Sequence, residues 1–243
     1  MKVSKNELMA SLKKAFEGLG FQPGDYYDAA DMVVWLETHG FDGFARLQAA
    51  LAYLNTTAPN HAVLIQEDAH NAVLDGEDSS ILLCGSEAVD LLVAQVMKGS
   101  VSGLQLKNCY NRTFILQRLV KAAQRNIAFV AYWRQEDYIV KVSVAAGAKL
   151  PDYRTFVMTE ILEPQSLTIF AGANLEAIKE QFAAQLVMGP TLETYTEKEM
   201  TACYLDSIEQ GIEIDEALWR MLEDLVDRIL VESTESSRAG AGD

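Results

Sequence analysis

The sequence is poor in cysteine and has no long apolar run. Its three cysteines are odd in number and form no CxxC pair, which argues against a disulfide framework or a zinc knuckle and fits a reducing, cytoplasmic setting. No apolar stretch approaches the ~18 residues that a membrane-spanning helix needs. The first residues carry lysines but no apolar core of signal-peptide length, so they predict an ordinary amphipathic helix.

Positive charge is also scarce. Lysine and arginine number 20 against 35 acidic residues, which gives a formal net charge of -15. Such a chain repels phosphate backbones and anionic lipid surfaces. We therefore expect neither nucleic acid nor a membrane among its partners.

The common catalytic and metal-binding motifs are missing. The sequence has no GxGxxG after a strand, no GxxxxGK[ST], no HExxH, no GxSxG and no EF-hand loop. His61 and His70 flank a predicted strand and favour two surface loop residues over a metal pair. Asp75, Glu77 and Asp78 lack the glycine and distal glutamate of a calcium loop, so they favour a solvated hairpin. No metal is predicted.

With 49% apolar and 23% charged residues, the chain can bury a proper core. Residues 1–56 are predicted to form a helical unit of three helices. A capping box at Ser4 and Glu7 begins the first helix, and Asp25 and Asp42 are predicted to cap the second and third.

Residues 57–231 are predicted to form a mixed α/β body. Two strands, HAVLIQ and NAVLDGEDSS, carry a turn signal at Asp75-Gly76, and a helix is predicted from Ser86. Strand–helix–strand spacing through residues 101–133 predicts crossover units packed on a sheet.

Three consecutive strands after Tyr138 imply antiparallel pairing, and hence a mixed sheet. Helices are expected at residues 174–187, at 196–208 and after Asp215. The small polar residues 232–243 predict a mobile tail. We expect one continuous α/β domain.

Two short stretches contain candidates for chemistry. Residues 28–47 predict a helix, a glycine-bounded turn and a second helix, with His39, Asp42 and Arg46 at the turn. Cys109 lies in KNCYNRT, between a strand and a helix, where the helix N-terminus and nearby cations lower a thiol's pKa. No base is evident nearby, so a packed, inert thiol is favoured over a nucleophile. Backbone N–H groups at such a junction can also hold an anion.

Several collinear segments resemble the malate/L-lactate/L-sulfolactate dehydrogenase superfamily, nicotinamide enzymes unrelated to the Rossmann dehydrogenases. WLETHGFDGFARL is similar to the family's DLRG-x-DSHG-x-x-RL and matches it at Gly43, Arg46 and Leu47. The segments LDGEDSSILLCGSEAVDLLVAQ, GLQLKNCYNRTF and GIEIDEALWRMLEDLVDRI are similar to later family segments. The resemblance implies an N-terminal three-helix unit packed on a mixed sheet in an α/β/α layered body. It also implies a homodimer with active sites at the subunit interface.

The departures from the family pattern bear on activity. The family's proton-donating histidine falls on Asp42, a second histidine falls on Asn111, and Cys109 replaces a serine. The sequence has no GTNP, DMATS or glycine-lysine-glycine segment of the kind that surrounds the cofactor phosphates. Asp42 could act as the acid only if burial raised its pKa, and His39 only if the turn were rebuilt. No cofactor is therefore predicted, with NAD(P) as the alternative.

Four polar residues remain as candidate ligand-binding groups. Arg46 keeps the position at which the family can hold a substrate carboxylate, a bidentate task suited to guanidinium, although a solvated surface arginine is the alternative. Asn108, Asn111 and Arg112 match or replace residues of the family's NS-x-HFG segment.

A narrower resemblance is to a bacterial family of unknown function. GLGFQPGDYYDAADMVVWL and VESTESSRAGAG are similar to its early and terminal segments. Three functions are open: an altered dehydrogenase relative that binds a small acid or a partner without hydride transfer, an NAD(P)-dependent reductase of a 2-oxo or 2-hydroxy acid, and an interaction subunit of an enzyme complex.

Overall fold

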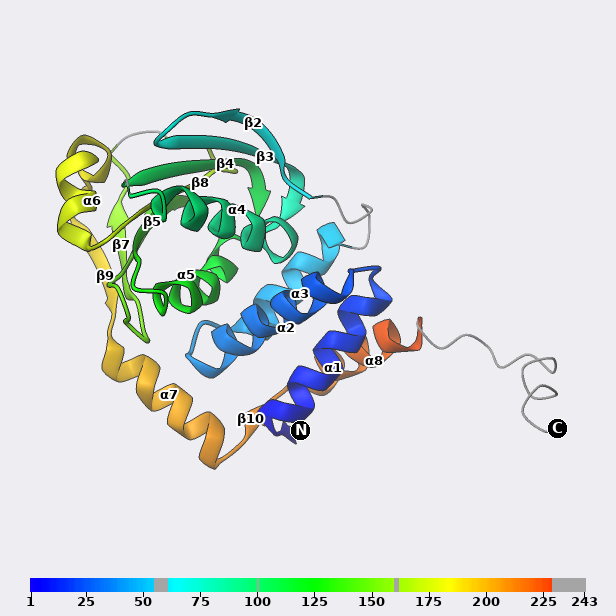
Figure 1. Cartoon of the computed structure of the whole chain (residues 1–243). Coiled ribbons are helices and arrows are strands. Elements are labelled where there is room, and N and C mark those ends of the chain that lie inside the picture. Colours follow the sequence, from blue (N-terminus) through cyan, green and yellow to red (C-terminus); the bar gives the residue numbers. More distant parts are fainter. Residues whose placement is uncertain (55–60, 100, 160–161, 229–243) are drawn as a thin grey trace.

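The computed structural model describes residues 1–54, 61–99, 101–159 and 162–228 (Figure 1). The helices are α1 (Lys5–Gly18), α2 (Pro23–Thr38), α3 (Gly43–Leu54), α4 (Ile81–Val96), α5 (Ile115–Ala123), α6 (Leu175–Gln181), α7 (Glu197–Glu209) and α8 (Glu216–Asp227), with 3-10 turns η1 (Arg112–Phe114) and η2 (Ala183–Leu186). The strands are β1 (Lys2–Val3), β2 (Val63–Glu67), β3 (Asn71–Ser80), β4 (Ser102–Tyr110), β5 (Ala128–Gln135), β6 (Tyr138–Val144), β7 (Asp152–Val157), β8 (Leu167–Gly172), β9 (Thr191–Tyr195) and β10 (Ile212–Glu213).

Eight strands form one mixed sheet in the order β2-β3-β4-β8-β5-β6-β7-β9. β3 and β4 are parallel and joined through α4, which makes the predicted crossover unit. β8 inserts between β4 and β5 and runs antiparallel to both. The mixed sheet predicted from the run of consecutive strands is therefore confirmed.

Helices cover both faces of this sheet (Figure 1). α4 and α5 pack on one face, α2 packs on them, and α1 packs between α2 and α8. The main core on this side runs from Val3 to Leu225. α6 and η2 cover the opposite face over a smaller apolar cluster around Phe170 and Phe182. The predicted α/β/α layering is confirmed.

The N-terminal strand pairs with the short strand that precedes α8. β1 pairs antiparallel with β10, and the amino group of Met1 donates to the carbonyl of Ile214 at 2.8 Å. Sequence alone did not predict β1, β9 or β10. The predicted tail, residues 232–243, lies outside the described residues. None of the helices that the structure describes is both long and apolar enough to span a membrane.

Capping side chains explain most helix starts, although not all as predicted. Ser4 and Glu7 form the capping box of α1, and Thr196 and Asp215 cap α7 and α8 as expected. α2 instead begins at Pro23, so the prediction that Asp25 caps it is wrong. Proline starts a helix well because its missing N–H has no partner to lose there.

The α4 boundary and the turn before β3 also differ from expectation. The β2–β3 turn forms at Asp68, whose Oδ1 accepts from the N–H groups of His70 and Asn71, both at 2.8 Å. β3 continues through Asp75-Gly76, where its pairing with β4 shifts register. α4 starts after Ser80, which accepts from Leu82 N–H, and not at Ser86. The side chain of Ser80 thus fixes the start of α4, and that of Asp68 fixes the β2–β3 turn. Hydrophobic periodicity placed both boundaries elsewhere.

The first turn of α3 packs directly on α2. A Cβ built on Gly43 would lie 2.4 Å from the carbonyl oxygen of Val33 and 2.7 Å from the backbone nitrogen of Glu37. Both neighbours are helix backbone and cannot move aside cheaply. Glycine is therefore required for the approach that places α3, and with it Arg46.

We predict that Gly43→Ala lowers the free energy of unfolding by about 2–3 kcal/mol, because the new methyl group overpacks two backbones. Gly24→Ala is the matched control, since no atom lies within 4 Å of its added Cβ. That control should change stability by less than about 1 kcal/mol, toward a more stable helix. Urea denaturation measures both, and equal effects of the two substitutions would contradict the close packing.

Candidate functional site

Three segments distant in sequence meet around one pocket of about 390 Å³: the face of α3, the junction between β4 and η1, and the β5–β6 turn. Three of the four predicted ligand-binding residues, Arg46, Asn111 and Arg112, line it together. The other lining residues are Ala49, Tyr53, Tyr110, Thr113, Phe114, Gln135 and Glu136.

Arg46 is half-buried at the pocket wall and is held by neutral oxygen atoms. Its Nε donates to the carbonyl of Phe41 at 2.7 Å, and its Nη1 donates to the hydroxyl of Thr113 at 3.3 Å. Among the described residues it makes no ion pair with a carboxylate. The alternative of a freely solvated surface arginine does not describe this side chain, whose orientation is fixed from two elements.

Arg112 is held in the same manner. Its Nη1 donates to the carbonyl of Cys109 at 2.8 Å, and its Nη2 donates to the carbonyl of Arg134 at 3.0 Å. Its Nε is buried and has no hydrogen-bond partner in the described part of the chain. Burial lowers the pKa of the Arg112 guanidinium, because removal from water penalises its charge.

Asn111 forms the junction between β4 and η1 in a left-handed conformation, with φ 57°. Its Oδ1 is buried without a partner among the described residues. Asn108 lies elsewhere: its Nδ2 donates to the two carboxylate oxygens of Asp75 at 2.9 and 3.0 Å. Asn108 does not line the pocket, so the four candidates do not form one group.

Sequence reasoning missed several residues that build the pocket. Tyr53 and Tyr110 stack with ring centroids 4.7 Å apart and form an aromatic wall. Thr113 fixes Arg46, and Glu136 adds a carboxylate from the β5–β6 turn, where φ is 52°. The polar run between two predicted strands, RQED, is a turn signal that could have drawn attention to Glu136.

Asp42 does not supply the predicted cap of α3. It precedes the helix with φ 50° and is exposed. The backbone N–H of Phe44 instead donates to Oε2 of Glu37 at 2.8 Å, so the preceding helix caps this one. Burial is the main cause that raises the pKa of Glu37, and the charge of Asp42 raises it further.

His39 does not line the pocket. Its ring stacks on Trp35 with centroids 4.2 Å apart and on Tyr204 at 5.1 Å. Its Nδ1 lies 2.7 Å from the carbonyl oxygen of Trp35. Burial lowers the pKa of this imidazole, since the cation loses its hydration. His39 thus joins α7 to α2.

Cys109 is a packed thiol. It is fully buried, and burial raises its pKa to about 12, although the Arg112 charge acts in the opposite direction. A thiol in this state is a poor nucleophile at neutral pH.

The side chains considered as metal ligands are engaged by protein groups or lie exposed. His61 pairs with Glu87 through Nδ1 at 2.7 Å, and His70 is exposed. Asp75 is engaged by Asn108 and by the N–H of Glu77 at 2.9 Å. No metal-ligating cluster occurs among the residues that the structure describes. The expected solvated hairpin is wrong in detail, because this acidic segment belongs to β3.

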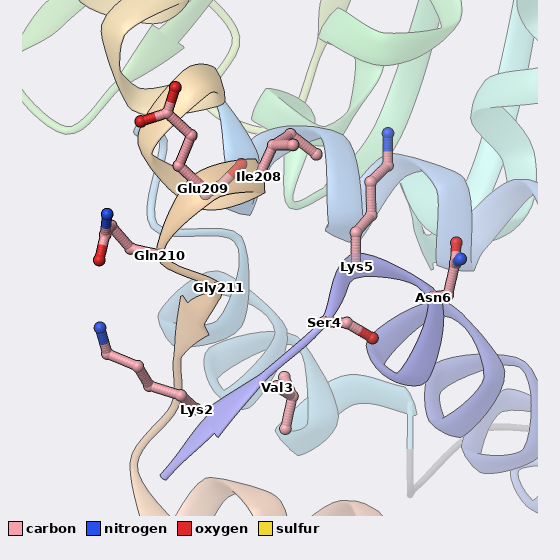
Figure 2. A pocket seen from close by; sticks show the side chains of 10 residues that line it. Lys2, Val3, Ser4, Lys5, Asn6, Ile208, Glu209, Gln210 and Gly211 are labelled. Atoms are coloured by element: carbon pink, nitrogen blue, oxygen red, sulfur yellow. The ribbon is translucent and has the colours of Figure 1, made fainter.

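A second hollow, of about 520 Å³, lies between β1 with the start of α1 and the α7–β10 link (Figure 2). Figure 2 shows Lys2 and Lys5 extending to different sides of this hollow. Lys5 Nζ lies 5.4 Å from the ring centroid of Tyr204, so its ammonium group already has a cation–π partner. The polar groups here do not converge as they do around Arg46.

We predict that Glu37→Gln changes how stability depends on pH. The folded-state pKa of Glu37 is raised above its ordinary value of 4.5, so the folded chain retains this proton longer than the unfolded chain as pH rises. Stability contributed by the protonated group is present below that ordinary value and is lost as pH rises through the folded pKa. Glutamine keeps an acceptor for Phe44 N–H and removes the titration.

As pH rises, for example from 4 to 8, the free energy of unfolding of Glu37→Gln should therefore increase relative to that of wild type. Glu17→Gln is the control, because Glu17 is exposed on α1. A difference between wild type and Glu37→Gln that is constant with pH would refute the proposed burial of this carboxyl.

Comparison with known proteins identifies structures that share the fold. A family model described as "Protein of unknown function (DUF3726)" matches residues 3–82, which include the His39–Arg46 turn. A search of the curated proteins finds no match. Malate dehydrogenase from Pyrococcus horikoshii OT3 has a TM-score of 0.64 at 11% identity, with 96% of each chain covered.

Two further solved structures agree. Sulfolactate dehydrogenase from Methanocaldococcus jannaschii has a TM-score of 0.63 at 11% identity and covers 94% of this chain and 97% of its own. Delta1-piperideine-2-carboxylate reductase from Pseudomonas syringae pvar. tomato has a TM-score of 0.61 at 11% identity, with 93% and 99% covered. The chain therefore has the fold of the malate, lactate and sulfolactate dehydrogenases, as its sequence predicts, and its N-terminal segment matches a family of unknown function.

Proposed function

We propose that this protein binds a small organic acid in the pocket lined by Arg46 and Arg112 and does not transfer hydride. The observation that carries the proposal is that both arginines face one pocket while neutral oxygen atoms hold them. In a chain with a net charge of -15, an arginine has many possible acidic partners. Among the described residues, Arg46 and Arg112 have no carboxylate partner. Their guanidinium groups are therefore suited to bind an anion from outside the chain.

The size and lining of the pocket limit the ligand. Its volume of about 390 Å³ falls near the lower end of the range for small-molecule sites, ~300–1,000 Å³. A guanidinium group recognises a carboxylate through two parallel hydrogen bonds, and Glu136 offers an acceptor at the same pocket. A carboxylate that also carries a hydroxyl or amino group would use both features.

The names of the structural neighbours agree with this ligand class. They refer to malate, sulfolactate and a piperideine carboxylate, each of which is a small carboxylic acid. At 11% identity these proteins share a fold with the chain, and their substrates serve here only as a choice of probes.

The residues present do not fit a nicotinamide hydride-transfer site. Asp42 is exposed and does not line the pocket. The ring of His39 lies in an aromatic stack outside the pocket. The segments that surround the cofactor phosphates in the resembled family are also missing from the sequence. We therefore favour binding without the dehydrogenase reaction.

We predict that malate, lactate or sulfolactate binds the wild-type protein in a calorimetric titration. Arg46→Gln and Arg112→Gln should each weaken that binding by about tenfold or more, because each removes a charged hydrogen-bond donor. Arg220→Gln is the matched control: it removes the same charge from an exposed residue on α8 that pairs with Glu216 at 3.6 Å. Its affinity should equal that of wild type.

Two outcomes would contradict the proposal. If Arg220→Gln weakened acid binding as much as Arg46→Gln does, the effect would come from the net charge of the protein and not from the pocket. If Arg46→Gln kept the wild-type affinity, the acid would not bind at this pocket. A fluorescence titration with NADH or NADPH separates the alternative function. Binding of either cofactor, followed by its oxidation with a 2-oxo acid, would support an NAD(P)-dependent reductase that uses Asp42 or His39 as the acid.

We also propose that the protein associates with itself through β2. β2 ends the large sheet, so the backbone groups on its outer side pair with no other described strand. Its side chains are exposed, including Val63, Leu64 and Ile65, of which Ile65 is 61% exposed. Exposed apolar edge strands invite pairing with another strand, and a second copy of the chain is the partner that we propose.

We predict that the wild-type protein forms a dimer of twice its 26.8 kDa mass in light scattering. Ile65→Lys should shift it toward monomer, because a charge on an edge strand opposes pairing. Ile208→Lys is the control, since Ile208 is similarly exposed, at 54%, but lies on α7. A wild-type monomer at all concentrations, or equal dissociation by both substitutions, would refute self-association through β2.

A further inference from the structure

A second cationic site lies on the opposite face of the sheet, where β6 and β7 pair. The antiparallel register places Lys141 directly opposite Arg154, and Ser143 opposite Asp152. Residues two apart on a strand share a face, so these four side chains lie on one face. η2 covers this face, because Lys141 Nζ donates to the carbonyl of Leu186 at 3.4 Å.

Two cations directly opposite each other destabilise an antiparallel pair. Lys141 is half-buried and makes no ion pair with a carboxylate among the described residues. Burial is the main cause that lowers its pKa, the charges of Arg154 and Lys179 lower it further, and Asp152 acts in the opposite direction. The sheet therefore holds a like-charge pair that an anion would relieve.

The acidic residue at this place is already engaged. Asp152 Oδ1 accepts from Arg154 Nε at 2.9 Å. The two terminal nitrogens of Arg154 and the ammonium of Lys141 have no acidic partner in the described part of the chain. Asp152 thus orients Arg154 and leaves most of its donors for another group.

The four side chains and Phe156 line a hollow of about 170 Å³. That volume corresponds to roughly six waters at ~30 Å³ each, which suits a compact tetrahedral anion better than an extended ligand. Lys141, Arg154 and the hydroxyl of Ser143 supply hydrogen-bond donors around it.

We propose that Lys141, Arg154 and Ser143 bind a phosphate group, either as the free ion or as a phosphate monoester. This site is separate from the Arg46 pocket, which lies toward α3 and η1. The charge-assisted hydrogen bonds that a dianion accepts here would offset the repulsion between Lys141 and Arg154.

The experiment titrates the full chain with inorganic phosphate and with glycerol phosphate in a calorimeter at constant ionic strength. We expect one site per chain that Lys141→Gln weakens by about tenfold or more, while Lys141→Arg retains it. Lys149→Gln is the charge-matched control, since Lys149 is exposed outside the hollow, and Arg46→Gln tests independence from the acid pocket. Both should bind phosphate like wild type. Tighter binding of the ester identifies a phosphorylated metabolite as the ligand, and equal or weaker binding identifies the free ion.

Thermal unfolding provides a second readout. Without phosphate, Lys141→Gln should be at least as stable as wild type, because the like-charge pair is gone. Phosphate should raise the melting temperature of wild type and leave that of Lys141→Gln unchanged. Equal phosphate affinity in wild type and Lys141→Gln, or loss of phosphate binding in Arg46→Gln, would overturn the proposal.

Discussion

The contact between the C-terminal half of α2 and the first turn of α3 is the constraint on which the candidate site depends. Gly43 allows the two backbones to meet, and Glu37 accepts a hydrogen bond from the N–H of Phe44. That geometry directs Arg46 toward Thr113, which lies in η1 directly after β4. The helical unit and the sheet therefore share one site because of a close backbone approach at a single glycine.

The distribution of charge connects this geometry with binding. The buried Arg118 has a carboxylate partner, Asp28, at 2.7 Å. Arg46 and Arg112 instead bond to backbone carbonyls and a hydroxyl, which orient a guanidinium without neutralising it. Such a cation retains its full attraction for an anionic ligand. Arg118 and the two arginines of the acid pocket thus differ in the charge of their partners.

Strand and helix spacing predicted the mixed sheet, because hydrophobic periodicity is a local signal. The α/β/α layers and three members of the pocket were implied by the family resemblance. The sequence did not predict that Glu37 caps α3 or that His39 stacks on Tyr204, since both depend on contacts between separate helices. Asn108 does not line the pocket, and its amide donates to Asp75 on the neighbouring strand, a long-range contact that local patterns do not reveal. Glu136 entered the site only through the pairing of β5 with β6.

The central claim is that Arg46 and Arg112 together bind the carboxylate of a small acid. Side-chain NMR of the arginine N–H groups during a titration with malate or lactate tests it most directly. The account predicts that signals of Arg46 and Arg112 shift together and saturate with one binding constant, while those of Arg220 stay unchanged. If the protein became saturated with the acid and neither arginine signal shifted, or if the signals of Arg46, Arg112 and Arg220 shifted equally, the claim would be contradicted.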